Sequence, residues 1–178
     1  MSYFDELCAA MNYLRQDPRT VFLGQAVAAK GTAMTTTVEM VQPSQKIEMP
    51  VAEEMQMGIS TGLALTGLVP VSFYPRWNFL LLATNQLVGH LDKISQMSEG
   101  GYQPKVIIRV GVGSERPLHP QCQHVGDFTD AFRLMLTTVE IIQLKESVDI
   151  FPAYKKALTR DDGRSTILVE YGDFYGEK

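Results

Sequence analysis

Apolar residues recur along the chain in two alternating patterns, some at helical spacing and others in short continuous runs. Helical spacing predicts a series of helices over residues 4–14, 51–67, 79–94, 128–136 and 146–158. Continuous runs predict strands that are buried on both faces, over residues 20–24, 68–74, 105–110, 139–144 and 166–171. Because strands and helices alternate, we expect an α/β fold, a mostly parallel sheet flanked by helices on both faces. Ligands of such sheets bind at the carboxyl ends of the strands.

Residues 25–49 interrupt this alternation, because Ala, Thr, Gly and Ser predominate there and no period is evident. The segment is longer than a typical connection and predicts a functional or partner-contacting loop. After it, Val51, Met55, Ile59 and Leu63 mark one apolar face of a helix.

The 178 residues fit a single domain, 1–178, with a core that needs no disulfide or metal. A net charge of -4 disfavours a nucleic-acid partner, since that requires clustered Lys and Arg. Cys8 and Cys122 form no CxxC pair, which disfavours a disulfide framework or a thiolate metal site. The sequence begins without a basic and apolar leader and has no membrane-spanning run, so we expect a cytoplasmic protein.

Glu53 is the first candidate for chemistry, because it follows Pro50 closely and falls in the first turn of a predicted helix. A carboxylate there lies at the positive end of the helix dipole, and the small residues around it predict a buried position. Acidic residues are also common in the first turns of ordinary helices, so Glu53 and its neighbour Glu54 suit a solvent-facing role as well.

Other motifs give weaker signals. The Gly-Val-Gly at 111–113 follows a strand, but no Gly-Lys-Ser/Thr follows it, so we expect a turn rather than a nucleotide loop. His119, Cys122 and His124 lie close together at a spacing that matches no zinc pattern, so we expect no metal site. Histidines in a loop after a strand suit substrate contact or proton transfer, with a solvated loop as the alternative. A hydrolase is disfavoured, because no Gly-x-Ser-x-Gly occurs.

Many spaced residues in the first half of the chain form one further pattern. They are Met49-Pro50-Val51-Ala52-Glu53, Gly58-Ile59, Gly62, Gly67-Leu68-Val69-Pro70-Val71, Asn78-Phe79, Asn85-Gln86 and Lys93. This pattern resembles the pyrimidine-binding domain of thiamine-diphosphate-dependent enzymes, in particular the beta subunits of 2-oxo acid dehydrogenases and the middle domain of transketolases. The resemblance extends from about residue 20 to residue 170 and is strongest over residues 50–108.

The resemblance implies a role for each of four residues. Glu53 matches the Glu that hydrogen-bonds the aminopyrimidine ring of the cofactor and promotes deprotonation of its thiazolium carbon. Phe79 falls where the family stacks an aromatic ring on the aminopyrimidine, although an aromatic residue at the start of a helix also suits the core. Pro75 falls in the adjoining wall, and His124 matches the His of the Gln-His pair that contacts the reacting substrate.

The resemblance also implies a partner. Family members hold the diphosphate through Mg2+ bound by a Gly-Asp-Gly motif on another domain, and no Gly-Asp-Gly occurs in this sequence. We therefore expect a pyrimidine-binding, beta-like subunit whose alpha-like partner supplies the Mg2+ and diphosphate site, with a homodimer of this chain inside the hetero-oligomer. The chain ends just after the last predicted strand, where dehydrogenase beta subunits continue into a C-terminal domain, which suggests a free-standing pyrimidine domain.

Two other functions remain open at this point. Gln25-Ala26 stands where dehydrogenase beta subunits usually carry acidic residues, which leaves open whether the donor is a 2-oxo acid or a ketose. One alternative is the small subunit of a non-oxidative 2-oxo acid decarboxylase. The other is a non-catalytic assembly or regulatory module that keeps the fold.

Overall fold

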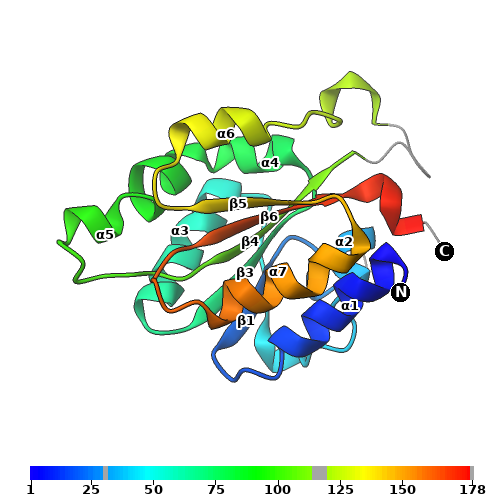
Figure 1. The fold of residues 1–178 in the computed structure, drawn as a ribbon, viewed down its shortest axis with the longest axis horizontal. Helices are drawn as coiled ribbons and strands as arrows, with labels where there is room; N and C mark the ends of the chain where they lie inside the picture. Colours follow the sequence, from blue (N-terminus) through cyan, green and yellow to red (C-terminus); the bar gives the residue numbers. More distant parts are fainter. Residues whose placement is uncertain (30–31, 114–119, 177–178) are drawn as a thin grey trace.

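The computed structural model describes residues 1–29, 32–113 and 120–176, and these form a single parallel six-stranded sheet (Figure 1). The strand order is β2-β1-β3-β4-β6-β5. All neighbouring strands pair in parallel. The strands are β1 (Thr20–Gly24), β2 (Lys46–Glu48), β3 (Val69–Tyr74), β4 (Ile107–Val112), β5 (Glu140–Leu144) and β6 (Thr166–Tyr171). The expected α/β fold with a parallel sheet is confirmed.

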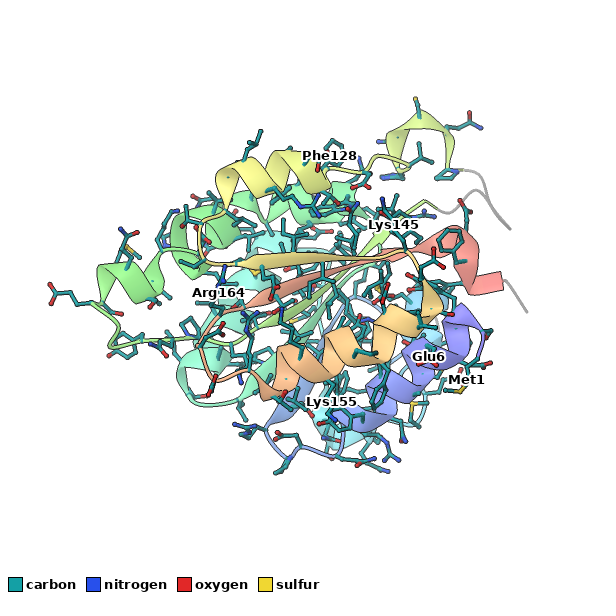
Figure 2. The ribbon with its side chains drawn as sticks, viewed as in Figure 1. Met1, Glu6, Phe128, Lys145, Lys155 and Arg164 are labelled. Carbon is teal, nitrogen blue, oxygen red and sulfur yellow. The ribbon has the colours of Figure 1, made fainter. Side chains whose placement is uncertain are left out.

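Helices cover both faces of the sheet (Figure 1). They are α1 (Tyr3–Leu14), α2 (Ala33–Thr36), α3 (Glu53–Leu65), α4 (Trp77–Leu82), α5 (Ile94–Met97), α6 (Thr129–Met135) and α7 (Ser147–Thr159). One buried cluster joins α1 and α7 to one face, and a second joins α3, α4 and α6 to the other. Figure 2 shows side chains filling the space between the sheet and both helix layers. None of the helices in the described part of the chain is long and apolar enough to cross a membrane.

Two segments differ from the sequence-based prediction. Residues 25–49 are not a plain loop, because they contain α2 and β2. β2 is a short edge strand with Lys46 and Glu48 at its ends, so it lacks the apolar run that identifies a buried strand. The helix expected over residues 79–94 is divided into α4, a π-helical turn (Asn85–Leu91) and α5, and apolar spacing alone does not detect such a break.

The apolar face predicted for α3 is largely exposed and does not pack on the sheet. Val51 is 70% exposed, Met55 45% and Ile59 37%. The face of α3 that packs on the sheet contains Gln56, Met57, Ser60, Thr61 and Ala64. This helix therefore buries a polar stripe and presents an apolar one to its surroundings.

The polar stripe is accommodated because α3 hydrogen-bonds to β3. The Gln56 side-chain amide donates to the Ser72 hydroxyl at 3.0 Å and to the Phe73 carbonyl at 2.8 Å. The Ser60 hydroxyl donates to the Ser72 hydroxyl at 3.1 Å. Buried polar groups are stable only when paired in this way, so the first two turns of α3 have a fixed position on the sheet.

An ion pair is buried under the opposite helix layer. Arg109 on β4 donates to both carboxylate oxygens of Glu170 on β6, at 2.6 and 2.9 Å, and neither side chain is exposed. Its third contact is the Thr37 hydroxyl at 2.9 Å. The hydroxyls of Tyr154 on α7 and Tyr175 after β6 also donate to Glu170. Because every partner is present, this network connects α7 and the segments around Thr37 and Tyr175 to the sheet without leaving a buried charge unpaired.

The strand order fixes where a ligand is expected. The chain runs from β1 outward to β2 and then returns to β3 on the other side of β1. The carboxyl ends of β1 and β3 therefore form a topological switch point, where α/β sheets bind ligands.

Candidate functional site

Glu53 lies at this switch point. It is the first residue of α3, the helix that follows β2 and covers β3. The Tyr74 hydroxyl, at the carboxyl end of β3, lies 3.4 Å from the Glu53 carbonyl, at the long limit of a hydrogen bond. Ala52, the residue before the helix, provides no side-chain cap. The first turn instead contains two acidic residues, Glu53 and Glu54. Such charges interact favourably with the exposed N–H groups of a helix N-terminus.

Glu53 is half-buried in this chain rather than fully buried as expected. Its negative charge nevertheless acts on the buried hydroxyl of Tyr74. Burial raises the pKa of the Tyr74 hydroxyl, the Ser72 hydroxyl opposes that rise by hydrogen bonding, and the negative charge of Glu53 adds to it. The Glu53 backbone contacts the Tyr74 hydroxyl, and the negative charge of its side chain acts on the same buried phenol.

Pro75 follows β3 directly and is held against the neighbouring strand. A Cβ atom added to Gly111 of β4 would lie 2.4 Å from the Pro75 carbonyl oxygen, so only glycine permits this approach. The Gly-Val-Gly at 111–113 thus has a packing function at its first glycine. It brings the turn that carries Pro75 close to the exit of β4.

The structure brings Phe79 and His124 into contact. Their ring centroids are 5.3 Å apart with an angle of 46° between the planes, and both residues are half-buried. Phe79 comes from the first turn of α4 and His124 from the segment that precedes α6. The Glu53 backbone carbonyl contacts the hydroxyl of Tyr74, and Tyr74 directly precedes Pro75 in the same region. His119 lies outside the described residues.

Several polar atoms in this region are buried and lack a hydrogen-bond partner. They are Trp77 Nε1, Asn78 Oδ1 and His124 Nδ1. An unpaired buried polar atom costs about 1–3 kcal/mol, and native proteins retain few of them. Two of these residues, Asn78 and His124, lie beside Phe79 in sequence or in space, and among the described residues their atoms have no partner.

These residues fit the aminopyrimidine half of thiamine diphosphate. A flat, weakly basic heterocycle needs a carboxylate for its ring nitrogen, an aromatic face to stack on and an apolar wall. Glu53, Phe79 and Pro75 are residues of these three kinds around the switch point. Within the described residues, no group of three or more His, Cys, Asp or Glu side chains could hold a metal ion.

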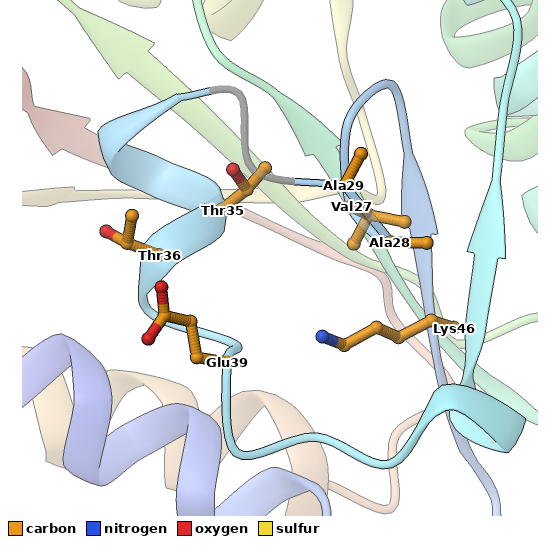
Figure 3. Close-up of a pocket in the computed structure, with 7 residues that line it drawn as sticks. All are labelled: Val27, Ala28, Ala29, Thr35, Thr36, Glu39 and Lys46. Atoms are coloured by element: carbon orange, nitrogen blue, oxygen red, sulfur yellow. The ribbon is translucent and has the colours of Figure 1, made fainter.

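A pocket of about 270 Å³ lies elsewhere, between the segment that follows β1, α2 and the start of β2 (Figure 3). Lys46 and Glu39 point into it from opposite sides. Glu53, Pro75, Phe79 and His124 do not line it. A site shared between two chains is open on one side in either chain alone, so this pocket does not by itself mark the chemistry.

Gln56 and Tyr74 carry no signal in the sequence as strong as that of Glu53. Gln56 interrupts the spacing of the apolar residues on α3, and a polar residue at a sheet-facing position was the available signal. Tyr74 is fully buried at the end of an apolar run and looks like an ordinary core residue until its hydroxyl is placed.

Comparison with known proteins agrees with this fold. The transketolase pyrimidine-binding domain matches residues 6–173. A pyruvate dehydrogenase E1 component subunit beta from Gracilaria tenuistipitata var. liui is 32% identical over 119 residues, which cover 65% of this chain and 37% of that protein. The 2-oxoisovalerate dehydrogenase subunit beta of Bacillus subtilis (strain 168) is 27% identical over 117 residues, covering 64% of this chain and 36% of the relative.

One further relative and one solved structure extend the match. The 3-methyl-2-oxobutanoate dehydrogenase subunit beta of Mycobacterium tuberculosis (strain ATCC 25618 / H37Rv) is 24% identical over 161 residues, covering 86% of this chain and 44% of the relative. A structure described as a split gene transketolase, inactive beta4 tetramer, superposes with a TM-score of 0.68 at 16% identity, over 96% of this chain and 51% of that one, which shows the shared fold. The chain spans less than half the length of these dehydrogenase subunits. Because the domain match covers nearly all of it, the chain belongs to the transketolase pyrimidine-binding domain family, a family of thiamine-diphosphate-dependent enzymes.

Proposed function

We propose that this chain is the pyrimidine-binding, beta-like subunit of a two-component thiamine-diphosphate-dependent enzyme that acts on a 2-oxo acid or ketose-type donor. The observation that carries the proposal is Glu53, which begins α3 at the switch point of the sheet and lies beside the hydroxyl of Tyr74. When bound, thiamine diphosphate supplies an acidic thiazolium carbon that adds to the carbonyl of the donor.

The chain itself contributes three groups to this chemistry. The Glu53 carboxylate shares a proton with the aminopyrimidine ring nitrogen and so orients and activates the cofactor. Phe79 stacks on the ring and Pro75 bounds it, which fixes the plane in which the nitrogen meets the carboxylate. The His124 imidazole, in contact with Phe79, is placed to contact the donor substrate or move a proton.

An alpha-like partner is proposed to complete the site and to hold the diphosphate through Mg2+. Two observations support a partner. The relatives that the chain resembles are named as beta subunits of dehydrogenases. The apolar stripe of Val51, Met55 and Ile59 also begins beside Glu53 and is exposed, and exposed apolar patches of this kind mark contact surfaces.

We further propose that residues 1–178 form one domain and that two copies of the chain associate within the hetero-oligomer. The split-gene transketolase that shares this fold is itself described as a beta4 tetramer that is inactive. By analogy, association of this chain with itself is expected to give an assembly that lacks activity until the partner is added.

Calorimetric titration tests the proposal. Thiamine diphosphate with Mg2+ is titrated into the chain alone, into the partner alone and into the assembled pair, and we expect tight binding only by the pair. Absence of binding by the pair would identify the chain as a non-catalytic module. Product analysis of the active pair then separates oxidative transfer from non-oxidative release of an aldehyde.

A further inference from the structure

Arg76 lies between the two residues that are proposed to bound and stack on the cofactor ring. It follows Pro75 at the carboxyl end of β3 and is the residue on which α4 begins, three positions before Phe79. Its side chain is half-buried. Among the described residues its guanidinium makes no hydrogen bond and no ion pair, although a guanidinium carries five N–H donors.

The Arg76 guanidinium is therefore available to a ligand. Burial lowers the pKa of Arg76, and the charge of Asp173 opposes that effect through space. Other arginines in this chain are paired when they are buried, as Arg109 is with Glu170 and Arg160 with Glu140. Arg76 differs from these two because no carboxylate is paired with it among the described residues, so an oxyanion from a ligand or a second chain can occupy its donors.

The surroundings of Arg76 show which side of the sheet faces the ligand. Asp173, whose charge acts on Arg76, lies against the end of β4, since a Cβ on Gly113 would be 3.2 Å from its carboxylate. The described chain resumes at Pro120, and His124 contacts Phe79. Asn78 Oδ1 and His124 Nδ1, both buried without a partner, belong to the same group of residues. Unsatisfied donors and acceptors thus gather around the turn that carries Arg76.

We propose that Arg76 is a subsite for an oxyanion of the donor substrate, a carboxylate or phosphate that is remote from the reacting carbonyl. This inference rests on the proposed function, since it places the substrate beside Phe79 and His124. A planar guanidinium can grip either group through two parallel hydrogen bonds.

The remote position follows from the chemistry of the reaction. In a 2-oxo acid the carboxylate next to the carbonyl is lost as CO2, and its negative charge disperses as the bond breaks. An arginine bound to that group would stabilise the ground state more than the transition state and slow the reaction. Arg76 therefore suits a second anionic group, as in a dicarboxylic 2-oxo acid or a ketose phosphate, and not the donors with purely apolar side chains.

The single tryptophan of the chain provides the test. Trp77 is adjacent to Arg76 and is buried against Phe132, with ring centroids 5.0 Å apart, so its fluorescence reports on this turn. The full chain is titrated at constant ionic strength with glutarate, with inorganic phosphate and with butyrate. We expect a saturable change with glutarate or with phosphate, and the stronger of the two identifies the substrate class. Butyrate, which has one carboxylate and an apolar tail, is expected to bind at least about tenfold more weakly.

Matched variants assign the binding to Arg76. Arg76→Gln is expected to lower the affinity for the anion that binds more strongly to the wild type by at least about tenfold. Arg133→Gln, which removes an exposed arginine next to Phe132, is expected to bind as the wild type does. Should circular dichroism show that Arg76→Gln is unfolded, Arg76→Lys keeps the charge but loses the two-point grip, and at least about threefold weaker binding is expected.

The outcomes are distinct. No saturable change in the wild type, or equal affinity in the folded Arg76 variant, overturns the subsite. Unchanged anion affinity together with loss of assembly in Arg76→Gln makes Arg76 a contact for an acidic group of the partner and also overturns it. The titration needs neither cofactor nor turnover, so Glu53→Gln should bind the anion normally, and failure of the proposed function leaves this result standing.

Discussion

Replacing Asp92 with asparagine tests how the α4 side of the fold is held together. The Asp92 carboxylate is not exposed and accepts hydrogen bonds from the backbone amides of Thr137, Thr138 and Val139, at 3.0, 2.7 and 2.9 Å. The hydroxyls of Thr137 and Thr138 donate at 2.8 and 3.0 Å, and Lys93 Nζ donates at 2.7 Å. The segment that leads into β5 is thereby fixed to the end of the π-helical turn.

Asparagine has the same shape but places an amide nitrogen where a carboxylate oxygen accepts several donors. Breaking a buried charge pair by removing one partner costs about 3–5 kcal/mol. For a chain of this size each kcal/mol lowers Tm by about 2–4 °C, so Asp92→Asn should melt about 6–20 °C below the wild type. Asp130→Asn, at a side chain that is 94% exposed, is the matched control and should change stability by less than about 0.5 kcal/mol.

The pH dependence gives an independent check on the charge. Burial alone would raise the pKa of Asp92, but hydrogen bonds from Lys93, Thr138, Val139 and Thr137 outweigh it and hold the pKa below its ordinary value. A lowered pKa contributes stability that is fully present above the unfolded-state pKa of about 3.9 and is lost as the pH falls toward the folded-state value. In urea titrations the difference between wild type and Asp92→Asn should therefore be largest near neutral pH and shrink below about pH 4. A loss under about 1 kcal/mol at pH 7, or a difference that is independent of pH, would refute this reasoning.

Three other substitutions have definite expected outcomes. Gly111→Ala places a methyl group 2.4 Å from the Pro75 carbonyl oxygen, so the turn must shift, and urea unfolding should show a loss of about 1–3 kcal/mol. Thr37→Val leaves a buried N–H of Arg109 without an acceptor and should cost about 1–3 kcal/mol in the same assay. Met55→Asp, at a 45% exposed position, should leave monomer stability within about 0.5 kcal/mol but weaken assembly measured by sedimentation, and intact assembly would remove α3 from the contact surface.

Much of the fold could be predicted because its strands are buried on both faces. The apolar runs at 20–24 and 166–171 coincide with β1 and β6, since a central parallel strand tolerates few polar residues. β2 was not predicted because an edge strand of three residues, with Lys46 and Glu48 at its ends, lacks a continuous apolar run. The apolar spacing on α3 predicted the helix but not which surface covers its apolar face, and that face is exposed in this chain.

The candidate site could be located from sequence only in part. Glu53 was found because helix starts at the carboxyl edge of a sheet attract acidic residues, and its role came from the family resemblance. Phe79 and His124 are distant in sequence, so their contact depends on the packing of α4 against the segment before α6. The hydroxyl of Tyr74 beside Glu53 and the unpaired state of Arg76 are properties of the folded chain, and no spacing in the sequence encodes them.

Turnover by the assembled pair with Glu53→Gln, compared with Glu54→Gln, tests the central proposal most directly. Both residues are acidic and lie in the first turn of α3, so each substitution removes one charge from the same helix end. Only Glu53 contacts the hydroxyl of Tyr74, through its backbone carbonyl. We expect both variants to assemble, Glu54→Gln to keep near-normal turnover and Glu53→Gln to lose about 10²–10⁴-fold. Equal turnover of the two variants would show that the Glu53 carboxylate is no more than a surface charge at a helix start.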